Sequence, residues 1–215
     1  MMTRIGCLHT SESNVAVFKA ARDGLDIELV HHVRPDLMEA AEREGGLTSA
    51  IVAETVFELR ELESQVDAVI LTCSTLGPAV DLVPGAGVPW LRADAALAEF
   101  AVAKGRHIAV LCAAETTLAS TTLLFEAAAD RMEMPPQIDI WLVPGAWAAF
   151  KDGNIAAYFM MLGEAADAAY RGGADVVAFA QASMAGAALD AKHGIPLTSP
   201  RAALERAVEL AAGRS

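Results

Sequence analysis

The stretch Asp67–Pro78, which reads DAVILTCSTLGP, decides the fold class. Its uninterrupted apolar run is typical of a strand that is buried on both faces, as in parallel sheets. The strand is followed by Cys73 and two hydroxyl side chains, and Gly77 then interrupts the regular structure. In open α/β sheets, ligands bind beyond the carboxyl ends of the strands, where Cys73 would lie. A lone cysteine is more often a small buried hydrophobe, so this stretch alone leaves both interpretations open.

The second half of the chain partly repeats this pattern in Asp175–Gly186, DVVAFAQASMAG. In both stretches an aspartate precedes an apolar strand, and Gln181 takes the place of Cys73. The offset between them is close to half the length of the 215-residue chain. Two other pairs of segments keep nearly the same offset: Ile5–Leu8 with Ile108–Leu111, and Gly87–Trp90 with Gly194–Leu197. This common order and spacing predicts two halves with one architecture.

Strand-like and helix-like segments alternate along the whole chain. Thr48–Gln65, for example, is an amphipathic helix that leads into the Cys73 strand. Alternation of this kind predicts an α/β fold with two similar Rossmann-like lobes, each built on a parallel sheet. We expect residues 1–92 plus 198–215 to form lobe 1 and residues 93–197 to form lobe 2.

The composition limits the class of partner and the compartment. A formal net charge of −12 argues against nucleic acid and against an anionic membrane surface. Three cysteines, with no apolar leader segment, favour the reducing cytoplasm over secretion. No uncharged run approaches the ~18 apolar residues of a membrane span. We therefore expect a cytoplasmic protein, and a homo-oligomer is compatible with the sequence.

Most cofactor and metal sites lack their sequence signatures here. Neither the dinucleotide fingerprint nor the Walker phosphate loop is present, and no Gly-x-Ser-x-Gly elbow occurs. Cys7, Cys73 and Cys112 do not have zinc-finger spacing, and His31-His32 has no ligand residue close by in the sequence. We therefore expect no cofactor and no metal. What remains is a thiol at a strand end, which suits proton transfer or nucleophilic addition by a thiolate.

These residues resemble the aspartate/glutamate/hydantoin racemase superfamily over nearly the whole chain. Cys73-Ser74-Thr75 is similar to the family's first motif, Cys-Asn-Thr, and Gln181–Met184 is similar to its second motif, Cys-Ala-Gly-Met. The resemblance implies two α/β lobes related by a pseudo-twofold axis, with the site in the cleft between them. It also implies cofactor-independent chemistry on a small carboxylate molecule, such as an amino acid, a hydantoin or a substituted malonate or maleate.

The chain departs from this family at Gln181, where the second cysteine would lie. A two-base racemase needs an acid or base on each face of the substrate, and glutamine cannot ionise. Cys112 and His9 each end the first strand of a predicted lobe, so either is a candidate for the missing second group. The departure favours proton transfer from one face only, as in a decarboxylase or a cis-trans isomerase.

The predicted function is therefore an isomerase or lyase of the racemase type with Cys73 and Gln181 as catalytic residues. The expected substrate-binding residues offer hydroxyl, amide, imidazole or backbone donors: His9, Ser11, Asn14, Ser74, Thr75, Thr116, Thr117, Ala182 and Ser183. Two alternatives remain open. One is a non-catalytic small-molecule-binding protein that has lost one of the two family cysteines, and the other is an unrelated α/β protein with regular strand–helix alternation.

Overall fold

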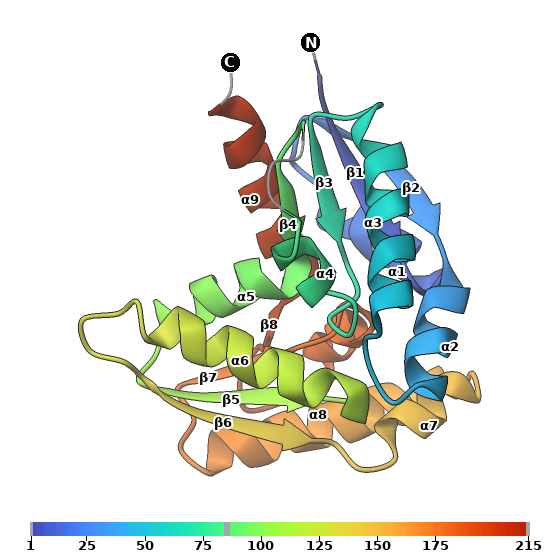
Figure 1. Ribbon diagram of the computed structural model, residues 1–215. Helices are drawn as coiled ribbons and strands as arrows, with labels where there is room; N and C mark the ends of the chain where they lie inside the picture. The colour runs from blue at the N-terminus through green and yellow to red at the C-terminus, as the bar shows by residue number, and fades with distance from the viewer. Residues whose placement is uncertain (1, 84–86, 214–215) are drawn as a thin grey trace. The chain divides into compact units, whose positions relative to one another are not determined.

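The chain folds into two α/β units, which are described from a computed structural model covering residues 2–83 and 87–213 (Figure 1). Unit 1 comprises Met1–Ala96 with Pro200–Ser215, and unit 2 comprises Leu97–Ser199. The boundary between them falls inside one helix and again at the start of the last helix. Each unit therefore contains its own sheet and its own hydrophobic core.

Unit 1 is built on a parallel sheet with the strand order β2-β1-β3-β4. Its elements are β1 (Thr3–His9), α1 (Ser13–Ala21), β2 (Ile27–Val33), α2 (Pro35–Arg43), α3 (Ser49–Glu63), β3 (Ala68–Leu71), α4 (Pro78–Asp81), β4 (Trp90–Arg92), the start of α5 (Ala93–Val102) and most of α9 (Ser199–Ala212).

The central strand β1 presents its alternate residues to different helices, as a strand buried on both faces must. Gly6 faces Leu62 of α3 and Val66, which follows α3; a Cβ atom would lie 3.2 Å from Val66, so the small residue allows this close approach. His9 faces α1 and makes an edge-to-face contact with Phe18. Helix α9 returns to this unit, and Arg201 donates a hydrogen bond of 2.6 Å to the Asp23 carbonyl. Both faces of the sheet are thus covered.

Unit 2 repeats this plan with the strand order β6-β5-β7-β8. Its elements are the end of α5, β5 (His107–Cys112), the 3-10 turn η1 (Glu115–Thr117), α6 (Leu118–Ala129), β6 (Gln137–Leu142), α7 (Ala146–Lys151), α8 (Ile155–Arg171), β7 (Val176–Phe179), the 3-10 helix η2 (Ala182–Leu189) and β8 (Leu197–Thr198).

The core of unit 2 follows the alternation of its strands. Val176 and Ala178 of β7 pack with α5 and α6, whereas Val177 and Phe179 pack with α7 and α8. Figure 1 shows the same arrangement, with α6 on one face of the sheet and α8 on the other. This two-sided burial explains why the strand sequences are almost continuously apolar.

The two sheets have the same strand order, because β5, β6, β7 and β8 correspond in topology to β1, β2, β3 and β4. The predicted α/β class with a parallel sheet in each half is therefore confirmed. It follows that Cys73, after β3, and Gln181, after β7, stand at equivalent places in their own sheets. The pseudo-twofold axis and the cleft stay predictions.

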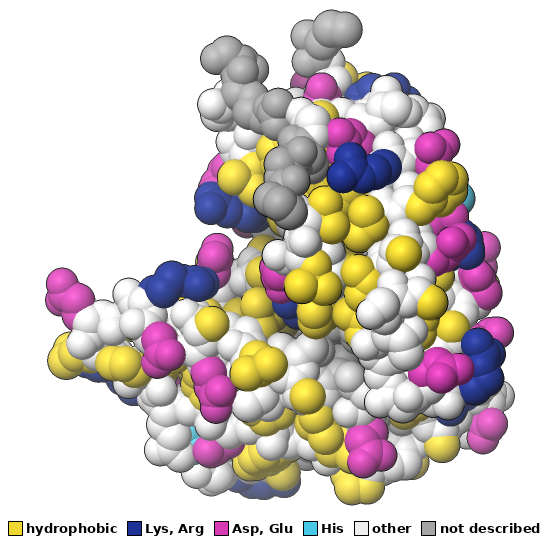
Figure 2. All heavy atoms as spheres, viewed as in Figure 1, with side chains coloured by type: hydrophobic (Ala, Val, Ile, Leu, Met, Phe, Trp, Pro, Cys, Tyr) yellow, Lys and Arg dark blue, Asp and Glu magenta, His cyan; other side chains and the backbone are white. Residues whose placement is uncertain are grey.

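The surface of helices α2 and α3 carries mixed charge. Figure 2 shows acidic and basic side chains interspersed over these helices. Arg34, for instance, pairs with Asp36 at 2.7 Å and with Glu54 at 3.1 Å. Among the described residues, no helix is both long and apolar enough to cross a membrane.

Candidate functional site

Cys73 lies directly beyond the carboxyl end of β3, as the sequence predicts for a ligand-binding edge. The Thr10 hydroxyl and the backbone N–H groups of Thr75 and Leu76 are hydrogen-bonded to its sulfur. Met38 of α2 approaches the same sulfur, with 3.9 Å between the two sulfur atoms. Three donors that converge on one thiol stabilise its thiolate form, which is the nucleophilic or basic form.

Burial nevertheless determines the net direction of the Cys73 pKa. Only 8% of the residue is exposed, and desolvation raises the pKa of the thiol above its ordinary value. The hydrogen bonds from Thr10, Leu76 and Thr75 lower the pKa, and the nearby charge of Asp94 raises it. The helix that follows Cys73 does not reverse this direction, because α4 has only four residues. At neutral pH the resting group is a protonated thiol.

A buried ion pair supports the turn after Cys73. Arg92 donates two hydrogen bonds to Asp94, of 3.0 and 2.9 Å, and a third of 2.7 Å to Asp81. A Cβ atom at Gly77 would lie 2.6 Å from the Arg92 guanidinium, so only glycine fits between the turn and this side chain. Sequence reasoning missed Arg92 and Asp94 because they lie on either side of the β4–α5 junction, far from Cys73 in the chain.

His9 is fully buried and both of its ring nitrogens are engaged. Nδ1 lies 2.9 Å from the Thr72 hydroxyl, and Nε2 lies 2.9 Å from Nδ1 of His31. Burial and the neighbouring His31 lower the pKa of His9 to about 3, so the ring is neutral at physiological pH. Its predicted role in substrate binding stays a prediction, and the resting structure leaves neither nitrogen free.

His31 has no ligand residue close by in the sequence, but it has two in space, Cys7 and His9. Cys7 is the register partner of His31 across β1 and β2, and His9 follows on the same face of β1. The sulfur of Cys7 and one nitrogen from each of these histidines lie within 4.8 Å of one another. Sequence spacing along β1 and β2 cannot reveal this contact, because it depends on the strand register.

Ser11 and Asn14 lie at the junction between β1 and α1, the same edge of the sheet as Cys73. The Ser11 hydroxyl is hydrogen-bonded to Ser13 at 2.8 Å. The Asn14 side chain is buried, and its Oδ1 has no hydrogen-bond partner among the described residues. A buried acceptor without a donor is rare, so Asn14 is the predicted binding residue with the clearest capacity for a ligand.

Gln181 of unit 2 is held by backbone donors at the end of β5. Its Oε1 accepts hydrogen bonds from the N–H groups of Ala113, at 2.7 Å, and Ala114, at 2.9 Å. These donors also fix the orientation of the amide, because only its oxygen can accept. Within the described part of unit 2, no residue accepts a hydrogen bond from Nε2. Gln181 thus presents an oriented amide donor.

The other predicted residues of the site differ in whether their side chains already have a partner within the protein. Thr117 is buried and its hydroxyl donates to the Ala114 carbonyl. Ser183 is hydrogen-bonded to the buried Tyr158 hydroxyl at 3.0 Å. Thr116 also has a partner within the protein. Ala182 begins η2 and offers its backbone. In unit 1, Ser74 and Thr75 are buried and partnered.

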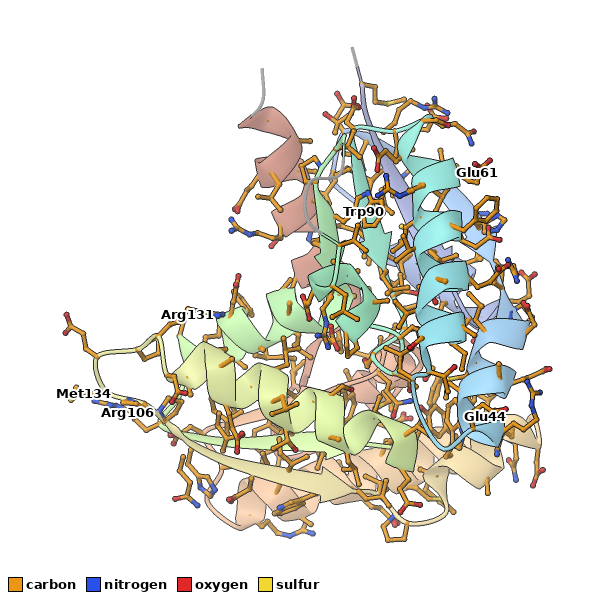
Figure 3. All side chains as sticks on the ribbon, in the orientation of Figure 1. Glu44, Glu61, Trp90, Arg106, Arg131 and Met134 are labelled. Atoms are coloured by element: carbon orange, nitrogen blue, oxygen red, sulfur yellow. The ribbon has the colours of Figure 1, made fainter. Side chains whose placement is uncertain are left out.

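A hollow of about 580 Å³ lies at the opposite edge of the unit 2 sheet, near the amino end of β5. Figure 3 labels Arg106, Arg131 and Met134 there, and Arg106 lies 3.7 Å from the Met134 sulfur. Helices α5 and α6 both have their C-terminal ends at this hollow. The partial negative charge of a helix C-terminus opposes anion binding, and the two arginines balance it. The hollow does not contain the predicted catalytic residues.

No family model and no curated protein matches the chain. Solved structures do match along almost its whole length. An aspartate racemase from Picrophilus torridus has a TM-score of 0.75 and 13% identity, and the match covers 98% of this chain and 94% of that one. The chain has the fold of a racemase. An allantoin racemase from Klebsiella pneumoniae (TM-score 0.69, 16% identity, 99% and 89% covered) gives the same result.

A glutamate racemase from Bacillus anthracis is also similar to the chain. Its TM-score is 0.68 at 17% identity, and the match covers 98% of this chain and 80% of that chain. In this racemase fold, each four-stranded sheet places one of the two predicted catalytic residues after its third strand in chain order. The likeness gives the fold, and the chemistry has to be argued from the side chains present.

Proposed function

We propose that the protein is a cofactor-independent isomerase or lyase that acts on a small carboxylate through the thiol of Cys73. The observation that carries this proposal is the surroundings of the Cys73 sulfur. It follows a buried strand of a racemase fold and accepts hydrogen bonds from Thr10, Thr75 and Leu76. Donors of this kind are of little use to an inert core cysteine, whereas they stabilise a thiolate formed during proton transfer.

The raised pKa of Cys73 suits a group that gives a proton. In the lyase form of this mechanism the substrate loses CO2 and becomes a planar enediolate. In the isomerase form the same enediolate arises when the thiolate of Cys73 accepts the α-proton. The S–H bond of Cys73 then breaks as a C–H bond forms, and the thiolate that remains is stabilised by the three donors. In the reverse direction the thiolate accepts the α-proton. Both proton-transfer steps thus use the same sulfur atom.

Gln181 is proposed to bind the oxygen atoms of a carboxylate substrate. Because Oε1 is held by Ala113 and Ala114, its Nε2–H groups are the part that can donate to a carboxylate or an enediolate oxygen. Glutamine cannot return a proton from the opposite face. The proposal is thus a one-sided proton transfer, which yields one product enantiomer or a geometric isomer.

The unpartnered Oδ1 of Asn14 favours substrates that carry an N–H group next to the carboxylate or carbonyl. A buried acceptor gains most from a donor that is absent in the free protein. Amino acids and hydantoins provide such a donor, whereas substituted malonates do not. We therefore rank amino acids and hydantoins ahead of malonates as candidate substrates.

A substrate panel in D2O tests the proposal. Amino acids, hydantoins and substituted malonates are incubated with wild-type protein and with Cys73→Ala, and NMR follows deuterium uptake at carbon. The proposal expects uptake or decarboxylation with at least one compound, and no activity above background in the variant. Activity that persists in Cys73→Ala would contradict the assigned role of the thiol.

A non-catalytic binding protein is the second candidate, because the resting thiol is protonated and the family's second cysteine is absent. This candidate predicts that a panel compound binds in calorimetry but exchanges no proton. It also predicts that Cys73→Ala leaves the affinity unchanged, since a binding site does not need a thiolate. The same panel therefore separates the two functions.

A further inference from the structure

Cys7, His9 and His31 form a cluster of soft and borderline ligands inside unit 1, apart from the proposed roles of Cys73 and Gln181. Cys7 is completely buried, and the described residues add no carboxylate to the cluster. The cluster lies between the central strand β1 and the edge strand β2, under Phe18 of α1. The strand register thus holds three potential ligands together on one face of a rigid sheet.

The hydrogen bonds fix where the protons of the two imidazoles lie. The Thr72 hydroxyl donates its only proton to the Leu8 carbonyl, so it must accept from Nδ1–H of His9. Nε2 of His9 is then an acceptor, and the donor to it is Nδ1–H of His31. This leaves a lone pair on Nε2 of His31, which is buried and has no partner among the described residues.

We infer that this cluster is a binding site for a thiophilic closed-shell cation, Cu⁺ in preference to Zn²⁺, with Cys7 Sγ, His9 Nε2 and His31 Nδ1 as ligands. Thiolate and imidazole are the ligands that these two ions prefer. The ion takes the place of the proton shared by the two rings. That proton moves to the unpartnered Nε2 of His31, and the thiol proton of Cys7 is released to solvent.

The nitrogen pair requires only a small adjustment, and the Cys7 sulfur, which lies within 4.8 Å of both nitrogens, has to move closer to them. The two ligating nitrogens lie 2.9 Å apart in the hydrogen-bonded state, whereas two nitrogens at about 2.0 Å from one ion lie about 3.3 Å apart. His31 can provide this change because it is only partly buried and lies on the edge strand β2. His9 remains fixed by its hydrogen bond to Thr72.

Charge decides between the two ions. One thiolate and two neutral imidazoles give a complex with Cu⁺ that has no net charge, whereas the complex with Zn²⁺ keeps a positive charge. A net charge inside a protein carries a desolvation penalty, and the cluster supplies no carboxylate to offset it. The positive charge of Lys19, which acts on His31, opposes the divalent ion further.

Metal titration of the full chain tests this inference. Cu⁺ is supplied under argon as its bicinchoninate complex, and Zn²⁺ is supplied against a chromogenic chelator. The inference expects one ion per chain, tighter binding of Cu⁺, and release of one proton per ion in calorimetry with two buffers. X-ray absorption of the Cu⁺ form should give one sulfur and two nitrogen ligands. Tighter binding of Zn²⁺, or a spectrum without sulfur, would overturn it.

Matched variants locate the site. Cys7→Ser and His31→Asn should each weaken Cu⁺ binding by more than about 100-fold, because even outer-shell changes cost 10–100-fold. Cys112→Ser and His32→Asn are the controls, since Cys112 is a buried cysteine of the other sheet and His32 pairs with Glu58 on the other face. Circular dichroism confirms folding. If a variant misfolds, the X-ray absorption spectrum of the wild-type Cu⁺ form still identifies the ligands and tests the site.

The sulfur pair of Cys73 and Met38 is the competing thiophilic site, with 3.9 Å between the sulfur atoms. Cys73→Ser therefore discriminates between the two positions. Unchanged Cu⁺ binding in Cys73→Ser supports the cluster of Cys7, His9 and His31. Loss of binding in Cys73→Ser, or retention of binding in Cys7→Ser, would contradict it.

Discussion

At the scale of single residues, the proposed chemistry depends on one thiol whose environment has opposing effects. Burial raises the pKa of Cys73, and hydrogen bonds from Thr10, Thr75 and Leu76 limit that rise. The sequence predicts the position of the thiol correctly, at the end of a buried strand. It does not predict the donor Thr10 or the contact with Met38, because both come from other parts of the chain.

Alkylation measures this balance directly. Since the pKa of Cys73 is raised, its rate of reaction with iodoacetamide should keep increasing with pH beyond the ordinary thiol value of 9.0. Thr10→Val removes one donor to the thiolate and should move the profile to still higher pH. Mass spectrometry assigns the labelled residue. Faster labelling of the fully buried Cys7 or Cys112 in the folded protein would contradict the assignment.

The role of Gln181 can be tested by a substitution that keeps its hydrogen-bond acceptor and removes its hydrogen-bond donor. Gln181→Glu keeps an oxygen that accepts from Ala113 and Ala114 but removes the Nε2–H donor. We expect it to reduce turnover by about 10²–10³-fold, the usual cost of one oxyanion donor. Gln181→Ala should cost a similar factor, and melting temperatures control for folding. Wild-type turnover in Gln181→Glu would show that the donor has no role.

At the scale of elements, the strands follow from the apolar runs and the turns after them follow from glycine, proline and hydroxyl residues. The long helix that begins near Thr48 is predicted from its amphipathic pattern, and the structure adds a side-chain cap from Thr48 to α3 and from Asn154 to α8. Helices α2 and α7 are missing from the sequence interpretation, since they are short and have no side-chain cap. Met38 lies on α2, so this omission also hid a neighbour of Cys73.

The turn between Cys73 and α4 offers a test of the scaffold. Gly77→Ala places a Cβ atom 2.6 Å from the Arg92 guanidinium, which Asp94 and Asp81 hold in place. Overpacking of this kind should destabilise the fold by about 1–3 kcal/mol and displace the donors to Cys73. Urea denaturation measures the first effect. Gly213→Ala is the control, because a Cβ atom there would meet nothing nearer than 3.6 Å.

Two histidines should give opposite pH dependence of stability. The pKa of His9 is lowered to about 3 by burial, so its contribution is present above the unfolded value of 6.5 and is lost as the pH falls toward 3. The hydrogen bond to Asp139 raises the pKa of His107, so its contribution is present below 6.5 and is lost as the pH rises. His9→Gln should therefore flatten the loss of stability in acid, and His107→Gln should steepen it.

Urea denaturation at several values between about pH 5 and pH 8 measures how the free energy of unfolding changes with pH. The slope of that dependence tests the two predictions, and the absolute stability does not. The slope is the useful quantity because replacement of the fully buried His9 also changes packing. Identical slopes in wild type and His9→Gln would mean that His9 does not stay neutral in the folded state.

At the scale of the whole molecule, the repeat in the sequence predicts two halves with one architecture, and the structure adds that the two sheets have the same strand order. The cluster of Cys7, His9 and His31 shows where such prediction ends. Those residues meet only through the pairing of β1 with β2, which no spacing in the sequence specifies. The unpartnered Oδ1 of Asn14 cannot be predicted from the sequence either, because it depends on which donors the folded chain brings near it.

The central claim is that one thiol transfers a proton to one face of the substrate. It is tested most directly by incubating each enantiomer of the best panel substrate in D2O and following deuterium at the reacting carbon by chiral chromatography and mass spectrometry. The account predicts exchange of a single enantiomer, its loss in Cys73→Ala, and gain of the second enantiomer in Gln181→Cys. Exchange of both enantiomers at similar rates by the wild-type protein would contradict it, because a second acid–base group would then have to act from the opposite face.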